Sequence, residues 1–260
     1  MNLWQGIVLG LVQGLTEFLP VSSSGHLVLV EALTGIHFAD VTVEVSLHVA
    51  TLGSLFVVYG RRLWDITRGV LRGDGPSVRY AALLAIATIP AALVGVLFHR
   101  QIERWFHSLF WLGVQFIITG IILWATRGPR GDRTVPSVGA AAGIGVAQAF
   151  AILPAISRSG ATVAVALWSG LTPAAAAEFS FLMAIPVIAG AGILEGRSAV
   201  LNVAQIGAVP WAVSFVVAFV AGIVSIRLLV ALLQRGRFHV FAPYCWALGL
   251  VILGFALWPA

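Results

Sequence analysis

The sequence has no lysine, one cysteine and few charged residues of any kind. Charged residues make up 10% of the chain, whereas they make up about 25% of a soluble domain. The single cysteine, Cys245, excludes an intrachain disulfide. No basic residue precedes Arg61, and a secretory signal opens with a basic segment. We therefore expect the first apolar segment to be retained in the mature protein.

The net charge of +5 arises because 15 arginines outnumber 10 acidic residues. No basic run alternates with aromatic residues, as a nucleic-acid-binding surface would require. We therefore expect no nucleic-acid partner. In an apolar chain, an excess of arginine indicates cytoplasmic loops and contact with anionic membrane lipids.

Long apolar runs dominate what remains. Apolar residues make up 60% of the chain, and the mean hydropathy is +1.00. Since ~20 mostly apolar residues cross a bilayer, the sequence predicts an all-α, polytopic membrane protein with a single membrane domain. Full spans are expected near residues 41–59, 80–98, 108–126, 174–194, 206–232 and 239–258.

Residues 2–35 and 136–171 do not fit a full span. Each region is apolar but interrupted in its middle by proline, serine and glycine, and each half is short for a crossing. Such a region is typical of a re-entrant helical hairpin, which enters the membrane and returns to the same side. Non-helical backbone at that depth must be buried in protein or line a wet cavity.

The two interrupted regions resemble each other, which indicates an internal duplication. GLVQGLTEFLPVSSSG (10–25) and GVAQAFAILPAISRSG (145–160) share five residues at a constant spacing of 135. The matched pairs are Gly10 and Gly145, Gln13 and Gln148, Ser22 and Ser157, Ser24 and Ser159, and Gly25 and Gly160. Each copy, 1–126 and 136–260, therefore combines one hairpin with three spans. Three crossings give the second copy an inverted topology.

The arginine distribution predicts the orientation. Loops 60–79, 127–135 and 233–238 share one side and hold ten arginines, whereas the other side holds Arg100, Arg104 and Arg197. Because cytoplasmic loops are enriched in arginine, both termini are predicted on the extracytoplasmic side. The two hairpins then enter from opposite sides, and their tips should meet near the midplane, where inverted-repeat proteins place their sites.

Ionisable side chains inside a membrane are costly and therefore mark candidate functional residues. These candidates are Glu17, His26, Glu44, His48, Arg158 and Glu178. If the tips meet, Glu17, His26 and Arg158 share one pocket.

Arg158 is the candidate that best fits an anion. It stands in SRSG (157–160), before the expected helix ATVAVALW. A guanidinium beside the N-terminus of a helix suits a phosphate or diphosphate. The first copy offers SSSG (22–25) before a helix expected to start at His26. The alternative is that the serines only cap helices, that the glycines only permit turns, and that Arg158 only pairs with a buried carboxylate of Glu17 or Glu178.

Chemistry at such an anion requires a proton carrier and an attacking group. His26 can transfer protons near neutral pH or attack phosphorus itself. Ser23 is a candidate nucleophile about one helical turn from His26. Glu17, four residues after Gln13, can orient His26 or a water, or share a weakly bound Mg²⁺ or Ca²⁺ with substrate phosphates.

Further polar residues are expected to support this site from behind. Glu44 and His48 lie four residues apart on one face of a predicted span. Glu178, in a predicted span of the second copy, is expected to have the same supporting role. Gln148 is the counterpart of Gln13. The alternative for these residues is an internal hydrogen bond between helices.

Three motifs carry a resemblance to a known family. Gln13-x-x-x-Glu17-Phe-Leu-Pro-Val-Ser-Ser-Ser-Gly-His26, LPAISRSGAT (153–162) and EFSFLMAIP (178–186) resemble the undecaprenyl-diphosphate phosphatase family, which is also known for bacitracin resistance. The similarity runs over nearly the whole chain. It implies an enzyme of the bacterial cytoplasmic (inner) membrane. Such an enzyme hydrolyses undecaprenyl diphosphate to undecaprenyl phosphate and phosphate on the extracytoplasmic side, which recycles the carrier for peptidoglycan and other envelope polymers.

By position, the resemblance implies a role for Gln13 and Glu17 in the [Glu/Gln]-x-x-x-Glu motif, for His26, and for the motif 154–162, which adds Thr162 to the phosphate-binding residues. The chain departs from the family at Ala155, where the family has glycine. Alanine would strain the loop if that position required a positive φ. Gln13 also weakens a metal site built on two carboxylates.

The sequence thus predicts a membrane phosphatase acting on a polyprenyl diphosphate. Arg158, Ser157, Ser159 and Thr162 would hold the terminal phosphoryl group, and the isoprenoid tail would lie between spans in lipid. Whether Ser23, His26 or water attacks phosphorus stays open, and so does the oligomeric state, a homodimer included. The rival hypothesis is a transporter or flippase for a polyprenyl phosphate lipid, because inverted repeats with broken helices are common in transporters.

Overall fold

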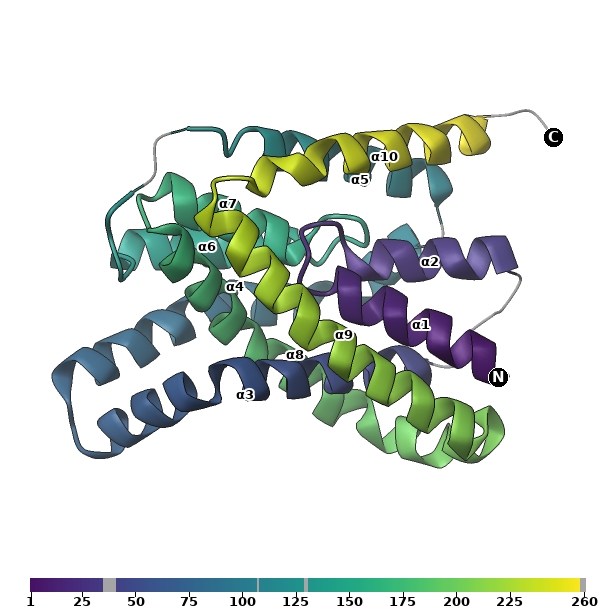
Figure 1. Cartoon of the computed structure of the whole chain (residues 1–260), viewed down its shortest axis with the longest axis horizontal. Coiled ribbons are helices and arrows are strands. Elements are labelled where there is room, and N and C mark those ends of the chain that lie inside the picture. Colours follow the sequence, from purple (N-terminus) through teal and green to yellow (C-terminus); the bar gives the residue numbers. More distant parts are fainter. Residues whose placement is uncertain (35–40, 107, 129–130, 258–260) are drawn as a thin grey trace.

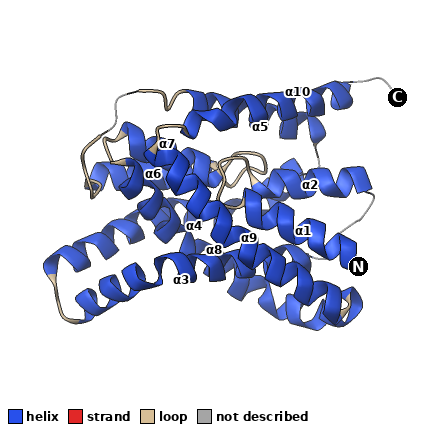
Figure 2. Cartoon of the chain, viewed as in Figure 1, coloured by secondary structure: helices blue, strands red, loops and turns tan. Residues whose placement is uncertain are grey.

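The computed structural model describes residues 1–34, 41–106, 108–128 and 131–257 of the 260-residue chain, without the side chains of 31–42, 44, 99–107, 191 and 194–206. Its helices, in chain order, are α1 (Leu3–Thr16), α2 (Ser23–Thr34), α3 (Val41–Leu71), α4 (Gly75–Phe106), α5 (Leu109–Trp124), α6 (Val138–Phe150), α7 (Arg158–Trp168), α8 (Pro173–Ile206), α9 (Ala208–Gln234), the 3-10 helix η1 (Phe238–Phe241) and α10 (Ala242–Leu257) (Figure 1). In the described part, helices joined by loops make up the fold, as expected (Figure 2). An isolated bridge pairs Arg133 with Leu171.

Short polar residues begin several of these helices. The Asn2 side chain accepts a hydrogen bond from the backbone N–H of Gln5 at 2.8 Å, and the Gln5 side chain accepts one from Asn2 at 2.7 Å, which forms a capping box at α1. Ser137 caps α6. Asp74 precedes α4 and accepts a hydrogen bond from the backbone N–H of Ser77 at 3.0 Å. Hydrogen bonds from Ser77 lower the pKa of the Asp74 carboxyl.

Two helix pairs occupy the regions that the sequence shows as interrupted. α1 and α2 enclose the loop 17–22, and α6 and α7 enclose the loop 151–157. In Figure 1 the first pair extends from the right and the second from the left, and their loops meet in the middle of the molecule. α2 begins at Ser23 and α7 at Arg158, earlier than predicted. Ser23 and Arg158 therefore lie in the first turns of these helices.

The predicted spans correspond to α3, α4, α5, α8, α9 and η1 with α10. Within the described residues, four segments are long and apolar enough to cross a membrane: Gly75–Phe98, Pro173–Gly190, Ala208–Gln234 and Phe238–Leu257. α5 has 16 residues and is shorter than a typical crossing. The span predicted near 41–59 lies within α3, which continues to Leu71. The helices support a multi-pass membrane protein.

Small residues bring α1 close to α9. Gly6, Gly10 and Gly14 recur every fourth residue on α1, and a Cβ atom at each would lie 2.5–2.6 Å from a backbone oxygen of α9. The facing oxygens belong to Pro210, Ser214 and Ala218, which also recur every fourth residue. Such small-residue stripes let helices approach closely within a membrane. In the second half, Gly145 of α6 packs in the same way against Ala87 of α4.

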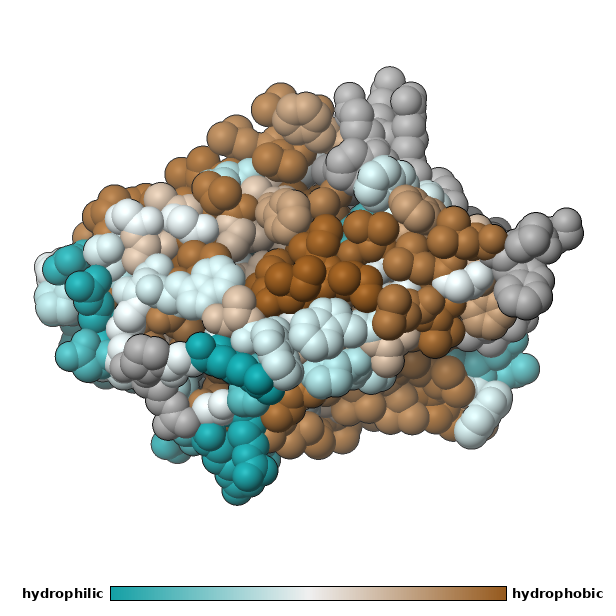
Figure 3. Space-filling view, turned by 90° about the horizontal axis from the view of Figure 1, so that it is seen from above, coloured by the Kyte–Doolittle hydropathy of each residue, from teal (hydrophilic) through white to brown (hydrophobic). Residues whose placement is uncertain are grey.

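The surface is consistent with a lipid environment. In Figure 3, apolar side chains form broad patches in the middle and right of the face, whereas the larger groups of strongly hydrophilic side chains lie at its left and lower left. Large apolar side chains exposed on the long helices include Phe56, Val96, Val216, Leu250 and Phe255. Apolar patches of this extent mark a membrane or a protein interface, and their place on apolar helices favours the membrane.

The packing of α1 on α9 predicts different outcomes for the same change at two glycines. Gly14→Ala places a methyl group 2.5 Å from the Ala218 oxygen and 2.6 Å from the Ala221 Cβ, so we expect the free energy of unfolding to fall by about 1–3 kcal/mol. Gly95→Ala on α4 adds a methyl group that meets no atom within 4 Å, so stability should stay the same or rise slightly. Thermal unfolding in detergent measures both. Equal melting temperatures would contradict the close packing.

Candidate active site

The first loop is fixed to the second hairpin by serine hydroxyls. Ser22 is the one non-glycine residue with a positive φ, 66°, among the residues described, and few such residues enter this region. The Ser22 hydroxyl donates to the carbonyl of Pro154 at 2.7 Å, and the Ser24 hydroxyl donates to the same oxygen at 2.7 Å. These bonds join the two loops and hold Ser22 in its unusual conformation.

The second loop is held by polar side chains of α5. The backbone N–H of Ala155 donates to Gln115 Oε1 at 2.9 Å. The Thr119 hydroxyl donates to the Ala155 carbonyl at 2.8 Å and accepts from the N–H of Ser157 at 3.2 Å. α5 thus satisfies backbone groups that no helix pairs. Ala155 is not among the described residues with positive φ, so alanine in place of the family glycine causes no strain there.

Glu17 lies where the two loops meet and binds side chains from both. Its Oε1 forms an ion pair with Nη2 of Arg158. Its Oε2 accepts hydrogen bonds from the Ser23 hydroxyl at 2.6 Å and from Gln13 Nε2 at 3.0 Å, and lies 3.4 Å from His48 Nε2. The structure therefore brings Glu17, Arg158, Ser23, Gln13 and His48 into one cluster, which we call the Glu17 cluster.

Burial sets the energetics of this cluster. The Glu17 side chain is 4% exposed and the Arg158 side chain 19%. Removing one partner of a buried ion pair leaves an uncompensated charge, which costs about 3–5 kcal/mol. A guanidinium carries five N–H donors, so a bond to one carboxylate oxygen leaves Arg158 able to bind a phosphate as well. The ion pair joins the two hairpins and holds the Arg158 guanidinium in a fixed position.

His26 lies beside this cluster, but its ring bonds elsewhere. Nδ1 lies 2.6 Å from the carbonyl oxygen of Ser22, and Nε2 lies 2.6 Å from the hydroxyl of Tyr244 on α10. The edge of Phe116 on α5 also packs against the ring, with centroids 5.5 Å apart. Phe116 leaves room for Gly25 alone, because a Cβ there would lie 2.7 Å from Phe116 Cζ. The sequence predicted one pocket for His26 and Glu17, but neither ring nitrogen bonds to Glu17.

The hydroxyls predicted to hold phosphate line the start of α7. Ser157 caps α7 by accepting from the N–H of Gly160 at 3.1 Å, and its Oγ lies 3.2 Å from that of Ser159. The Thr162 hydroxyl donates to the Arg158 carbonyl at 2.7 Å and lies 2.6 Å from the Ser180 hydroxyl. These contacts agree with helix capping, and the helix N-terminus they shape also suits an anion.

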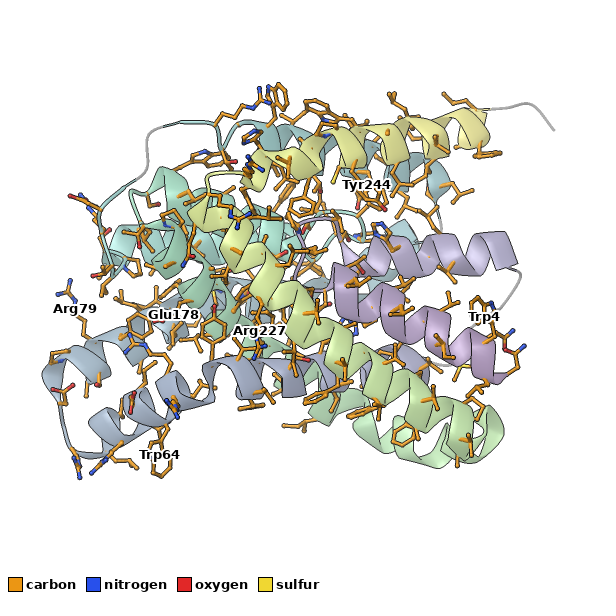
Figure 4. The ribbon with its side chains drawn as sticks, in the orientation of Figure 1. Trp4, Trp64, Arg79, Glu178, Arg227 and Tyr244 are labelled. Atoms are coloured by element: carbon orange, nitrogen blue, oxygen red, sulfur yellow. The ribbon has the colours of Figure 1, made fainter. Side chains whose placement is uncertain are left out.

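Three predicted supporting residues lie apart from the Glu17 cluster or are not described. Glu178 accepts hydrogen bonds from Arg62 Nε at 2.8 Å and from the Tyr80 hydroxyl at 3.1 Å, and Figure 4 shows it well away from Tyr244. Glu178 thus follows the alternative, a contact between helices. Gln148 is buried, and neither polar atom of its side chain has a hydrogen-bond partner. The side chain of Glu44 lies outside the described residues.

The described residues contain no group of three His, Cys, Asp or Glu side chains that could hold a metal ion. Both oxygens of Glu17 already face donors, one of them a guanidinium. The buried Oε1 of Gln13 has no hydrogen-bond partner and is an oxygen ligand of the type that Mg²⁺ and Ca²⁺ take. A tight site made by the protein alone does not fit this set, and a cation shared with substrate phosphates stays a prediction.

Sequence reasoning did not identify the residues that hold the site in place. Gln115 and Thr119 carry a readable signal, because they are polar residues four positions apart within the apolar run LFWLGVQFIITGIILW (109–124) and both are buried. Ser180 lies two positions after the predicted candidate Glu178 in the sequence. Tyr244 carries no comparable signal, because its partner His26 is 218 positions away in the chain.

Comparison with known proteins agrees with the motifs. Residues 6–251 match the family described as bacitracin resistance protein BacA. A protein of Desulforapulum autotrophicum named undecaprenyl-diphosphatase is 40% identical over an alignment of 276 positions. The alignment covers 98% of this chain and 99% of the relative. A relative with the same name from Carboxydothermus hydrogenoformans is 41% identical, and the match covers 97% of each chain. Another from Salinibacter ruber is 36% identical, and the match covers 99% of each chain. The chain therefore belongs to the BacA family.

Proposed function

We propose that this chain hydrolyses undecaprenyl diphosphate to undecaprenyl phosphate and phosphate. The observation that carries the proposal is the Glu17 cluster, in which one buried carboxylate binds both the Arg158 guanidinium and the Ser23 hydroxyl. The Arg158 guanidinium, which can bind a phosphoryl group, thus lies beside the Ser23 hydroxyl, which donates a hydrogen bond to the Glu17 carboxylate. The membrane family and the names of its relatives favour a lipid diphosphate as the substrate.

Ser23 is the nucleophile that this geometry favours. Its hydroxyl lies 2.6 Å from Glu17 Oε2, and a nucleophile within hydrogen-bond reach of a base is the usual arrangement for covalent catalysis. Ser23 Oγ attacks the terminal phosphorus, its proton passes to Glu17, and the bond to the bridging oxygen breaks. Undecaprenyl phosphate leaves, and water then releases phosphate from Ser23.

The second hairpin supplies the charge stabilisation. Arg158 binds the equatorial oxygens of the transferred group, where negative charge is concentrated. Ser157, Ser159, Gly160 and Thr162 shape the N-terminus of α7 around it, and Ser22, Ser24 and Gly25 do the same for α2. His26 carries protons at the edge of the site. Gln13 and Glu17 would hold a divalent cation, which would neutralise charge on the substrate phosphates.

The topology proposed from sequence fits this chemistry. The pairs α1–α2 and α6–α7 act as re-entrant hairpins of two inverted repeats, 1–126 and 136–260, and both termini and the catalytic opening face the extracytoplasmic side. The isoprenoid tail stays in lipid beside exposed apolar side chains such as Val216 and Leu250. Hydrolysis inside a membrane protein follows from a substrate whose tail does not leave the bilayer.

Replacement of Arg158 tests the role of the guanidinium. Arg158→Ala should lower kcat for phosphate release by about 100-fold to 1,000-fold, since it removes a charge-stabilising group. Arg158→Lys should recover only part of the loss, because lysine lacks the bidentate fork. The matched control is Arg62→Ala, which breaks the ion pair with Glu178 and should retain most activity.

The assay uses purified protein in detergent, where no transmembrane gradient exists. Phosphate release that falls sharply in Arg158→Ala and in His26→Ala supports the enzyme. A wild-type protein that releases no phosphate but moves polyprenyl phosphate across vesicles would instead establish the transporter.

Replacement of Ser23 tests the attacking group. Ser23→Ala should lower kcat by about 1,000-fold or more, and acid-quenched wild-type protein should carry phosphate on Ser23 during turnover. Ser214→Ala is the control, because its buried hydroxyl donates to a carbonyl of its own helix, that of Trp211, at 2.7 Å. A Ser23→Ala variant with near wild-type rates and no trapped phosphate would show that water attacks directly.

Cysteine labelling tests the orientation. The single Cys245 is buried, and Cys245→Ala provides a background for new cysteines at exposed Trp4 and Arg72. In intact cells a membrane-impermeant maleimide should label Trp4→Cys directly and Arg72→Cys only after the membrane is permeabilised. The reverse pattern would contradict the arginine-based orientation.

A further inference from the structure

The hydrogen bonds of His26 determine which ring nitrogen carries the proton. The carbonyl oxygen of Ser22, 2.6 Å from Nδ1, can only accept a hydrogen bond. Nδ1 therefore carries the hydrogen, and in the neutral ring Nε2 is the acceptor. The hydroxyl that lies 2.6 Å from Nε2 belongs to Tyr244 and donates to it. The contact with Tyr244 thus selects a single tautomer.

We propose that Tyr244 is the positioning residue of His26, which keeps Nε2 as the basic nitrogen and fixes the plane of the ring. The inference rests on the proposed phosphatase function, in which His26 carries protons. Tyr244 acts through His26 and need not touch the substrate.

The packing around the ring supports a positioning role. The Tyr244 ring lies nearly parallel to the His26 ring, with an interplanar angle of 5° and a centroid distance of 5.7 Å, and the Phe116 ring lies across it at 85°. Two aromatic side chains from α10 and α5 thus contact the imidazole and limit its orientation. Next to Tyr244, the buried Cys245 Sγ lies 3.8 Å from the Pro20 carbonyl, which ties α10 to the first loop.

A phenol suits a histidine that changes its protonation state. A tyrosine hydroxyl can both donate and accept. It donates to Nε2 of the neutral ring. Because that bond occupies the single lone pair of Nε2, the hydroxyl turns aside when Nε2 takes up a proton, and its oxygen then accepts the new N–H. The same hydroxyl therefore serves both protonation states of the ring, and Tyr244 keeps its own proton.

Tyr244 also lies at the boundary of the site. Its side chain is 48% exposed and is placed between α10 and α2 (Figure 4). Within the described part of the chain, the ring of His26 contacts Ser22 from its own loop, Phe116 from α5 and Tyr244 from α10. Tyr244 is the titratable residue among these three. If the titration of His26 changes when Tyr244 is replaced, the change therefore reflects the loss of this direct contact.

The test removes one oxygen atom. Tyr244→Phe keeps the aromatic ring but loses the hydroxyl, and we expect kcat to fall by about 10-fold to 100-fold, as for other orienting partners of functional histidines. KM should change by less than about threefold, and the limb of the pH–rate profile that His26→Ala abolishes should shift. The control is Tyr59→Phe, which removes the same atom from a side chain packed against Phe181.

A spectroscopic measurement keeps the inference separate from the proposed function. In wild-type protein with isotope-labelled histidine, the His26 signal, assigned with His26→Asn, should report a protonated Nδ1 and an unprotonated Nε2. Tyr244→Phe should convert it to a mixture of tautomers. Unchanged His26 signals, or an unchanged kcat and pH profile in an active wild-type background, would overturn the inference. An inactive wild type with a shifted His26 signal would refute the function alone.

Discussion

The structure depends on the buried ion pair between Glu17 and Arg158, which joins the two loops 17–22 and 151–157. Each loop connects two helices and carries backbone groups that side chains must satisfy where water is absent. The first loop uses Ser22 and Ser24 to reach the Pro154 carbonyl of the second, and the ion pair adds opposite charges at the same junction. Because the charges come from different hairpins, the site exists only when both hairpins are in place.

The similar segments 10–25 and 145–160 differ at the residues that make the site, which explains why one site results instead of two. The constant spacing of 135 pairs Glu17 with Ile152, Ser23 with Arg158, and His26 with Ala161. The first hairpin holds the carboxylate, hydroxyl and imidazole, and the second holds the guanidinium. The same comparison accounts for Gln148. Gln13 donates to Glu17, whereas the counterpart of that carboxylate is Ile152, which leaves the amide of Gln148 without a partner.

Local patterns predicted much of the fold, and long-range packing set the rest. Proline, serine and glycine marked both loops, and these lie together as expected. α3 continues to Leu71 because arginine and leucine favour helix beyond the apolar run. The direction of the His26 ring was not predictable, because α10 and α5 supply Tyr244 and Phe116 from distant parts of the chain. Glu178 was placed near the site by analogy with Glu44, but Arg62 and Tyr80 bind it elsewhere.

The resting ion pair also explains how a buried cation can await an anionic substrate. An isolated guanidinium at this depth would be costly, and Glu17 offsets that cost while holding Arg158 in a fixed orientation. In the mechanism that we propose, an arriving diphosphate shares the guanidinium with the carboxylate, so little reorganisation is required as charge develops. The weakened hold on Glu17 would leave its carboxylate freer to accept the proton of Ser23, whose hydroxyl it already binds. The proposal thus couples binding of the substrate to activation of the nucleophile through one side chain.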